Sequence, residues 1–231
     1  MNLDTLLACM PGLRRDIASG YLPFMETAMR EFQITTAPRS WMWLAQVGHE
    51  SASLRYMEEI ASGSAYEGRL DLGNTSPGDG RRFKGRGPIQ LTGRANYTRA
   101  GQALKLPLVA EPHLAARPQH AFRVSAWWWW QAGLNPISDR LDVIGATRRI
   151  NGGTNGLRDR QERYARVRAL GDRVIPGPVP TQSPTPPLPV RALSVATMPD
   201  FRFELFRVGG EKVEHRWNAR EGGWVKGWEA L

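Results

Sequence analysis

The feature that most constrains this chain is a proline-rich stretch, "PGPVPTQSPTPPLP", at residues 176–189. Seven of its fourteen residues are proline. Proline lacks a backbone N–H and locks φ, so neither a helix nor a central strand can run through such a stretch. The chain is therefore expected to fold in two parts joined by a semi-extended linker. We place a larger domain at 1–172, the linker at 173–198 and a small module at 199–231.

The first of these parts has the patterning of helices. Apolar residues from Phe24 to Phe32 recur at helical spacing, and Pro23 just before them predicts a helix start. A second stripe runs from Trp41 to Gly48. Between about 61 and 88 the pattern gives way to Gly, Ser, Asn, Asp and Pro, and so long a loop in a compact domain is often functional. We therefore expect a mainly α fold.

The segment after the linker is patterned differently. "FRFELFRV", "KVEHRW" and "GWVKGW" alternate with a period of about two and are separated by glycine-containing turns. They predict a small β-rich C-terminal tail of two or three strands, too short to bury a large core.

The balance of charge narrows the possible partners. Lys and Arg number 31 against 22 Asp and Glu, which gives a formal charge of +9. A basic protein is drawn to polyanions such as nucleic acid, anionic membrane or anionic cell wall. No apolar run approaches the roughly 18 residues of a membrane span, so we expect no stable membrane insertion. The basic stretch "RDRQERYARVRA" is interpreted as a solvated helix face, and no nucleic-acid partner is expected.

The first candidate for chemistry is Glu50 in "GHESASLRYMEE". On a helix that continues from residue 41, Glu50 shares an apolar stripe with Trp43 and Val47. A carboxyl in such surroundings is desolvated, which raises its pKa and lets it donate a proton near neutrality. The alternative is a glutamate at a helix end whose carboxylate reaches water.

A second acid, Glu59, follows nine residues later. In one unbroken helix the two would lie on opposite faces, about 13.5 Å apart along the axis. They can cooperate only if the helix ends between about 50 and 54 and the chain folds back. Glu58 and Glu67 are the alternatives for this second role.

A third element is "FKGRGPIQLTGRANY" at 83–97, in which "PIQLT" is interpreted as a short strand. Alternation then puts Gln90 and Thr92 on one face, with Asn96 just beyond, where they can orient water and sugar hydroxyls. The alternative is an edge hairpin with its polar face in solvent. "WWWW" at 127–130 covers about 300° of a helix, so one core cannot receive all four side chains.

These motifs together resemble one known family. "HES", an acid nine residues after its glutamate, "GRGPIQLTGRANY", "INGG" and "RQERY" occur in this order. In this combination the chain resembles glycoside hydrolase family 19 over about residues 20–171. It looks most like the chitinase-related endolysins of bacteriophages and prophages. The resemblance implies a mainly helical, lysozyme-like domain with a deep cleft.

The resemblance also implies roles for single residues. Glu50 matches the general acid, Glu59 the general base, and Thr92 the residue that holds the attacking water. Positions that line the sugar cleft are matched by Gln90, Asn96, Asn151 and Arg160. The chain departs from the family in two places that matter here: many relatives have glycines where it has Ala52 and Ser53, and plant chitinases have a longer stretch between the two acids.

The sequence thus predicts an enzyme that cleaves the β-1,4-linked amino-sugar backbone of peptidoglycan with inversion. A chitinase, a non-catalytic wall-binding protein and a nucleic-acid binder are the alternatives. No metal or organic cofactor is expected, and we expect a monomer. The first residues lack an export signal's basic start and apolar stretch. Synthesis in the host cytoplasm without a standard signal peptide, and action on the wall after release, are therefore expected.

Overall fold

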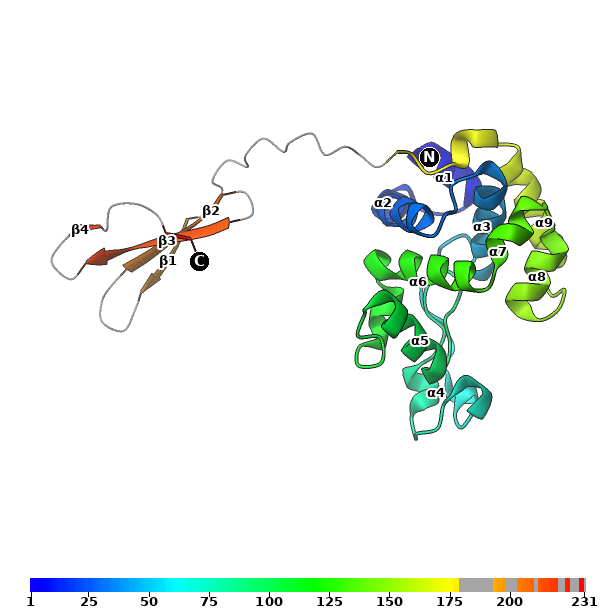
Figure 1. Cartoon of the computed structure of the whole chain (residues 1–231), viewed down its shortest axis with the longest axis horizontal. Helices are drawn as coiled ribbons and strands as arrows, with labels where there is room; N and C mark the ends of the chain where they lie inside the picture. The colour runs from blue at the N-terminus through cyan, green and yellow to red at the C-terminus, as the bar shows by residue number, and fades with distance from the viewer. Residues whose placement is uncertain (179–192, 198–202, 210–211, 220–222, 225–228, 231) are drawn as a thin grey trace. The chain divides into compact units, whose positions relative to one another are not determined.

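A computed structural model describes residues 1–178, 193–197, 203–209, 212–219, 223–224 and 229–230 of the chain. It divides into two compact units, Met1–Val179 and Pro180–Leu231. The first unit is mainly helical, as predicted, and Figure 1 shows its elements in order. No helix in the described ranges has the length and apolar character needed to cross a membrane.

The helical unit is built from α-helices of four to seventeen residues and short 3-10 helical turns. In chain order they are α1 (Leu3–Cys9), α2 (Arg15–Glu31), α3 (Ala37–Glu50), η1 (Ser64–Tyr66), η2 (Leu70–Leu72), α4 (Asp79–Arg82), α5 (Arg94–Leu104), η3 (Pro112–Ala116), α6 (Pro118–Gln131), α7 (Leu134–Asp139), α8 (Val143–Asn151), α9 (Leu157–Arg168) and η4 (Gly171–Val174).

Helix α3 lies at the centre of the larger of two apolar clusters. Trp43, Leu44 and Val47 on α3 are buried there together with residues of α1, α2, α6, α7 and α9. The pairs α3–α9 and α2–α6 pack most extensively. A smaller cluster joins α5 to the other side of α6, where Phe83, Tyr97 and Trp127 are its largest members. In Figure 1, α4 and α5 form the lower part of this unit, below α6, and α3, α8 and α9 lie toward its right-hand side.

The four tryptophans of α6 divide between these clusters. Trp129 belongs to the larger one and Trp127 to the smaller, while the half-buried Trp128 packs against both. Trp130 is 52% exposed. Because successive residues turn by about 100°, a run of four can serve two cores and still present one ring to solvent.

Helix α2 differs from the sequence expectation. Pro23 was expected to begin a helix, but α2 begins eight residues earlier, at Arg15, and contains Pro23. A proline inside a helix removes one hydrogen bond at a cost of about 3 kcal/mol. Burial of Ala18, Met25 and Met29 along the whole helix offsets that cost, since each buried apolar side chain contributes roughly 1–3 kcal/mol.

The second unit contains an antiparallel sheet of β1 (Leu193–Thr197), β2 (Phe203–Gly209), β3 (Lys212–Ala219), β4 (Gly223–Trp224) and β5 (Glu229–Ala230). Strands β1, β2 and β3 are consecutive neighbours, with Leu193 opposite Arg207 and Glu204 opposite Trp217. β4 and β5 both pair with β3.

The proposed linker, 173–198, differs from the structure at both of its ends. Residues 173–178 lie in the first unit, because η4 extends to Val174 and Gly177 bonds to Glu26 on α2. At the other end, β1 begins at residue 193. The proline-rich residues 179–189 lie outside the described ranges.

Candidate active site

Glu50 is the last residue of α3, at the end of its buried stripe. Trp43 and Val47 are fully buried, whereas the Glu50 side chain is 20% exposed. The helix ends there because the Ser51 hydroxyl donates to the Val47 carbonyl at 2.5 Å and accepts from the Leu54 amide at 2.8 Å. Glu50 is thus a carboxyl on the boundary between the core and solvent.

A left-handed turn follows at once. Ala52, Ser53 and Leu54 have φ of 50°, 64° and 61°. The Ser53 amide donates back to the Gly48 carbonyl at 2.6 Å. Helix α3 therefore ends between residues 50 and 54, as it must if Glu50 and Glu59 are to cooperate. The turn redirects the chain toward residues 85–87.

Glu59 is held where the redirected chain meets that segment. Its amide donates to the Gly85 carbonyl at 2.9 Å, and its carboxylate accepts from the Gly85 amide and from the Tyr66 hydroxyl, each at 3.0 Å. A Cβ on Gly85 would lie 2.7 Å from the Gln90 amide oxygen and 3.2 Å from a Glu59 carboxylate oxygen. Only glycine therefore lets Glu59 and Gln90 lie against the same point of the backbone.

The two alternative bases are engaged in other contacts. Glu58 pairs with Lys84 at 3.0 Å and with Arg86 at 3.3 Å. Partial burial raises the pKa of Glu58, but these two cations outweigh it and hold that pKa below its usual value. Glu67 accepts from the amides of Gly78 and Gly80 at 2.5 and 2.9 Å, so it braces its own loop.

A groove of about 270 Å³ brings most of the predicted site together. Its lining includes Glu50 together with Gln90, Thr92 and Asn96, which follow Glu50 about forty residues later in the sequence. The remaining lining residues are apolar: Leu72, Ile89, Leu91, Trp128 and Ile150. Glu59 is outside this lining but adjoins it through Gln90.

Backbone carbonyls of the same segment hold the polar side chains of the groove in place. The Thr92 hydroxyl donates to the Gln90 carbonyl at 2.9 Å, and the Asn96 amide donates to the Thr92 carbonyl at 2.6 Å. The side-chain amide of Gln90 donates to the Gly87 carbonyl at 2.9 Å. Preorganised donors and acceptors of this kind suit the fixed hydroxyls of a sugar.

The interpretation of "PIQLT" as a strand is wrong. Residues 87–90 form a turn, closed by a hydrogen bond of 3.0 Å from the backbone amide of Gln90 to the Gly87 carbonyl. Leu91 makes only an isolated bridge with Arg86. Gln90 has φ of 56°, which strand geometry excludes, so a turn and not strand alternation aims its side chain.

Arg160 lies behind the groove and does not line it. Its side chain is 2% exposed, and it donates to Glu50 and to Gln46, one turn earlier on α3. The structure therefore places this predicted sugar ligand as the buried partner of Glu50. It reaches that position because α9 packs along α3.

Asn151 does not line the groove either. It is exposed at the end of α8, donates to the Asn155 carbonyl at 2.8 Å and accepts from the Gly153 amide at 2.8 Å. Its amide thus closes its own loop, and its neighbour Ile150 reaches the groove instead.

His49 belongs to a charged network behind the left-handed turn. Its Nδ1 lies 2.6 Å from Asp159, which also accepts from Arg163 at 2.7 Å. Arg163 in turn donates to the Ser53 hydroxyl at 2.9 Å. Burial raises the pKa of Asp159, but the hydrogen bonds from His49 and Arg163 bring it below its usual value. The network ties α9 to the turn that follows Glu50.

Sequence reasoning missed two residues of this site, Tyr66 on Glu59 and Gln46 beside Arg160. It left open whether one or two of the four tryptophans of α6 face the cleft, and Trp128 lines the groove wall. Gln46 carried a signal, because it is a polar residue within an otherwise buried stripe. Tyr66 carried none beyond its place in the long loop. Within the described ranges no cluster of three His, Cys, Asp or Glu side chains is placed to hold a metal ion.

Comparisons with known sequences identify relatives of this chain. Residues 35–153, about half of the chain, match the sequence profile of glycoside hydrolase family 19, described as chitinase class I. Two endochitinases of Arabidopsis thaliana are 46% and 44% identical over 118 and 113 residues. These matches cover 50% and 48% of this chain but only 40% and 38% of those proteins. The chain therefore spans less than half the length of these relatives.

A bacterial relative is matched over more of its length. A glycosyl hydrolase family 19 domain-containing protein of Haemophilus influenzae is 30% identical over 154 residues, which are 53% of this chain and 75% of that protein.

Solved structures show the same fold. A mutant of chitinase C superposes with a TM-score of 0.62 at 22% identity, covering 78% of this chain and 95% of its own. Chitinase C from Streptomyces griseus superposes with a TM-score of 0.61 at 21% identity, covering 77% and 78%. The predicted mainly helical, lysozyme-like fold is confirmed.

Proposed function

Because this chain belongs to glycoside hydrolase family 19, the chitinase class I family, we propose that it hydrolyses β-1,4 bonds between amino sugars, with peptidoglycan as its natural substrate. One observation carries the proposal. Glu50 lies in a groove with Gln90, Thr92 and Asn96, and a second carboxylate, Glu59, is held beside Gln90.

Glu50 acts as the general acid. It is the acid that lines the groove in the described structure, and α3 holds it against the apolar groove wall. In the reaction it protonates the glycosidic oxygen, and the bond from that oxygen to the anomeric carbon breaks. Arg160, which is itself held by Gln46, positions its carboxyl and stabilises the carboxylate that remains after the proton has left.

Glu59 acts as the general base. Tyr66 and the Gly85 amide fix its orientation. It takes a proton from a water molecule held near Thr92 and Gln90, and the water oxygen attacks the anomeric carbon on the face opposite the leaving group. The product then has the inverted configuration. Inverting enzymes of this kind use two carboxyl groups with room for one water between them.

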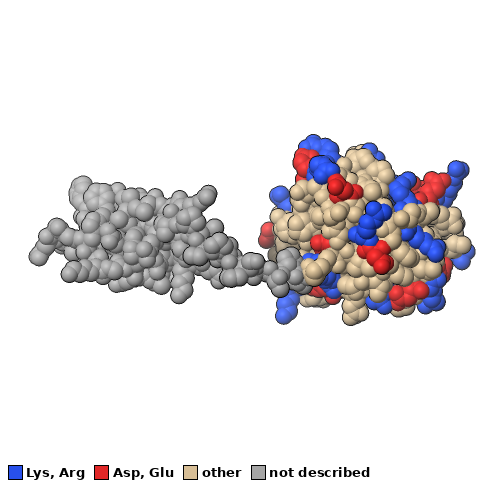
Figure 2. Space-filling model, turned by 90° about the horizontal axis from the view of Figure 1, so that it is seen from above, with Lys and Arg blue, Asp and Glu red and all other residues tan. Residues whose placement is uncertain are grey.

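The charge of the chain supports an anionic polymer as substrate. A formal charge of +9 draws the protein to a negatively charged wall. On the face of the helical unit that Figure 2 shows, blue and red side chains are interspersed and not gathered into one basic patch. A diffuse positive charge favours attraction to an extended anionic surface over recognition of a nucleic-acid backbone. We propose that the protein acts as a monomer on the wall, as an endolysin does, after release from the cytoplasm.

Chitin is the second candidate substrate. It is favoured by the two Arabidopsis relatives, whose names describe them as endochitinases. The two substrates share the β-1,4 amino-sugar backbone and differ in the lactyl and peptide branches of peptidoglycan, so the products identify the substrate.

The experiment is digestion of purified peptidoglycan and of chitooligosaccharides, followed by mass spectrometry of the fragments. We expect soluble muropeptides with a new reducing end. The identity of the sugar at that end shows which of the two alternating glycosidic bonds is cut. Glu50→Gln and Glu59→Gln are each expected to lower the rate by about 10²–10⁴-fold, the usual contribution of a general acid or base.

Glu58→Gln and Glu67→Gln are the matched controls and should keep most of the rate, provided that circular dichroism shows them folded. Hydrolysis that survives Glu50→Gln would refute the mechanism. Wall binding without new reducing ends would identify a non-catalytic binding protein instead.

A further inference from the structure

We propose that a pocket next to the groove binds a carboxylate on the branch that peptidoglycan carries and chitin lacks. This inference rests on the proposed function and names the feature of the substrate that the site recognises. The pocket has a volume of about 210 Å³ and is lined by Asn96, Arg99, Trp127, Trp128, Gln131 and Arg149, together with one alanine.

The pocket adjoins the groove through two shared residues. Asn96 and Trp128 line both cavities. The Asn96 amide nitrogen donates to the Thr92 carbonyl at 2.6 Å, and its oxygen accepts from Arg99 at 2.5 Å. A substituent on a sugar bound in the groove therefore needs to pass only one side chain to reach Arg99.

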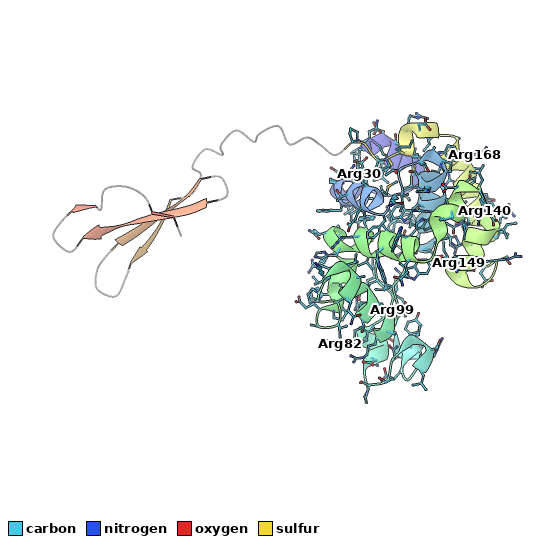
Figure 3. All side chains as sticks on the ribbon, in the orientation of Figure 1. Arg30, Arg82, Arg99, Arg140, Arg149 and Arg168 are labelled. Carbon is cyan, nitrogen blue, oxygen red and sulfur yellow. The ribbon has the colours of Figure 1, made fainter. Side chains whose placement is uncertain are left out.

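Two cations define the chemistry of this pocket. Arg99 comes from α5 and Arg149 from α8, and both are labelled in Figure 3. Both are exposed. Among the described residues the guanidinium of Arg149 has no hydrogen-bond or ion-pair partner. No acidic side chain lines the pocket. An arginine whose donors are unused can bind a carboxylate with two parallel hydrogen bonds.

The rest of the lining suits a peptide branch. Trp127 and Trp128 supply apolar walls for aliphatic atoms, and Gln131 offers an amide for a peptide group. The sugars of chitin carry only neutral N-acetyl and hydroxyl groups. Peptidoglycan carries a lactyl group on every second sugar, either as a free carboxylate or extended by a peptide stem that has carboxylates of its own. The pocket would therefore favour peptidoglycan over chitin.

The test compares Arg149→Gln with Arg148→Gln in the full chain. Arg148 precedes Arg149 on α8, is also exposed, and does not line the pocket. Both variants remove one positive charge, so a general electrostatic effect is the same in each. Muramyl dipeptide, which is anionic, and chitobiose, which is neutral, are titrated by calorimetry.

We expect Arg149→Gln to weaken binding of muramyl dipeptide about tenfold relative to chitobiose, equivalent to about 1.4 kcal/mol. Arg149→Glu should weaken it further, and Arg148→Gln should leave the ratio unchanged. Equal losses for both ligands, or equal losses in the 148 and 149 variants, would overturn the proposal.

Hydrolysis assays separate the two sources of the carboxylate. The substrates are stem-bearing glycan, glycan stripped of its stems by an amidase, and a neutral chitooligosaccharide. A loss in Arg149→Gln confined to the stripped glycan, whose lactyl carboxylate is free, identifies the lactyl group. A loss confined to stem-bearing glycan, in which the lactyl carboxyl is amide-linked, identifies a carboxylate of the stem, and a loss on both shows that the pocket accepts either carboxylate. If the wild-type chain prefers muramyl dipeptide over chitobiose but cleaves none of the substrates, the proposed function is refuted while the proposed carboxylate pocket is supported.

Discussion

Among single residues, the three that follow Ser51 are the most unusual. Ala52, Ser53 and Leu54 are all in the left-handed region, which costs a non-glycine residue roughly 1–2 kcal/mol. The turn persists because Ser51 holds Leu54 and Arg163 holds Ser53. Strain of this kind persists only where the surroundings over-determine it, and here it lies directly behind the proposed acid.

Ala52→Gly is expected to stabilise the protein. Glycine removes the left-handed penalty but adds backbone entropy to the unfolded chain, so the net gain is about 0.5 kcal/mol. Urea denaturation at neutral pH measures it. Ala165→Gly, at an exposed position inside α9, is the control and should lose about 1 kcal/mol. A loss at both positions would show that residue 52 is not strained.

At the scale of elements, the long loop between 61 and 88 is ordered by short helices and by hydrogen bonds and ion pairs between polar side chains. The Asp79 side chain, at the start of α4, is 1% exposed and pairs with Arg94 at the start of α5. Arg94 donates from its Nε at 2.8 Å, and its amide donates to Asn74 at 2.8 Å. These contacts hold the loop to α5, the helix that carries Asn96.

Asp79→Asn is expected to destabilise the helical unit by about 2 kcal/mol at neutral pH, because it breaks a largely buried pair whose arginine keeps some solvent contact. The hydrogen bond from Arg94 holds the pKa of Asp79 below its usual value of 3.8, even though burial opposes it. The unfolded chain therefore takes up this proton first as the pH falls.

The contribution of this pair is consequently complete above about pH 4–5 and is lost as the pH falls through the lower, folded-state pKa. Unfolding experiments on both proteins from pH 7 to pH 3 should show the difference between them shrinking in that acidic window. A difference that stays constant with pH would contradict the ion-pair explanation.

At the scale of the whole molecule, the helical unit is closed by residues 175–177, at the start of the proline-rich stretch. The Gly177 amide donates to Glu26 at 2.9 Å, and Arg30 donates to the Gly177 carbonyl at 2.7 Å. The Met1 amino group donates to Glu26 and to the Ile175 carbonyl, each at 2.7 Å. The end of the unit thus joins Met1, which precedes α1, to α2.

Truncation after residue 179 is expected to leave a folded unit with the thermal transition that this unit has in the full chain. Truncation after 172, the boundary expected from sequence, removes Ile175 and Gly177 and should lower Tm by about 4 °C for a loss of roughly 1–2 kcal/mol. Differential scanning calorimetry measures all three chains. Equal transitions for the two truncated chains would show that the closing contacts contribute nothing.

Much of the fold and of the groove followed from local sequence. The apolar stripe of α3 predicts a helix with Glu50 at the edge of its buried face, and a separation of nine residues requires the chain to reverse before Glu59 if the two acids are to cooperate. The positions of Gln90, Thr92 and Asn96 in one motif keep them together. These features depend on periodicity and on short-range geometry, which a sequence carries within a few residues.

The tertiary structure decided which distant side chains meet. Arg160 pairs with Glu50 across 110 residues, a contact set by the packing of α9 on α3. The same packing leaves Asn151 outside the groove, while the path of the long loop brings Tyr66 to Glu59. No local pattern encodes such contacts, because they depend on how the whole core closes. Pro23 likewise lies inside a helix because burial along all of α2 outweighs a local preference.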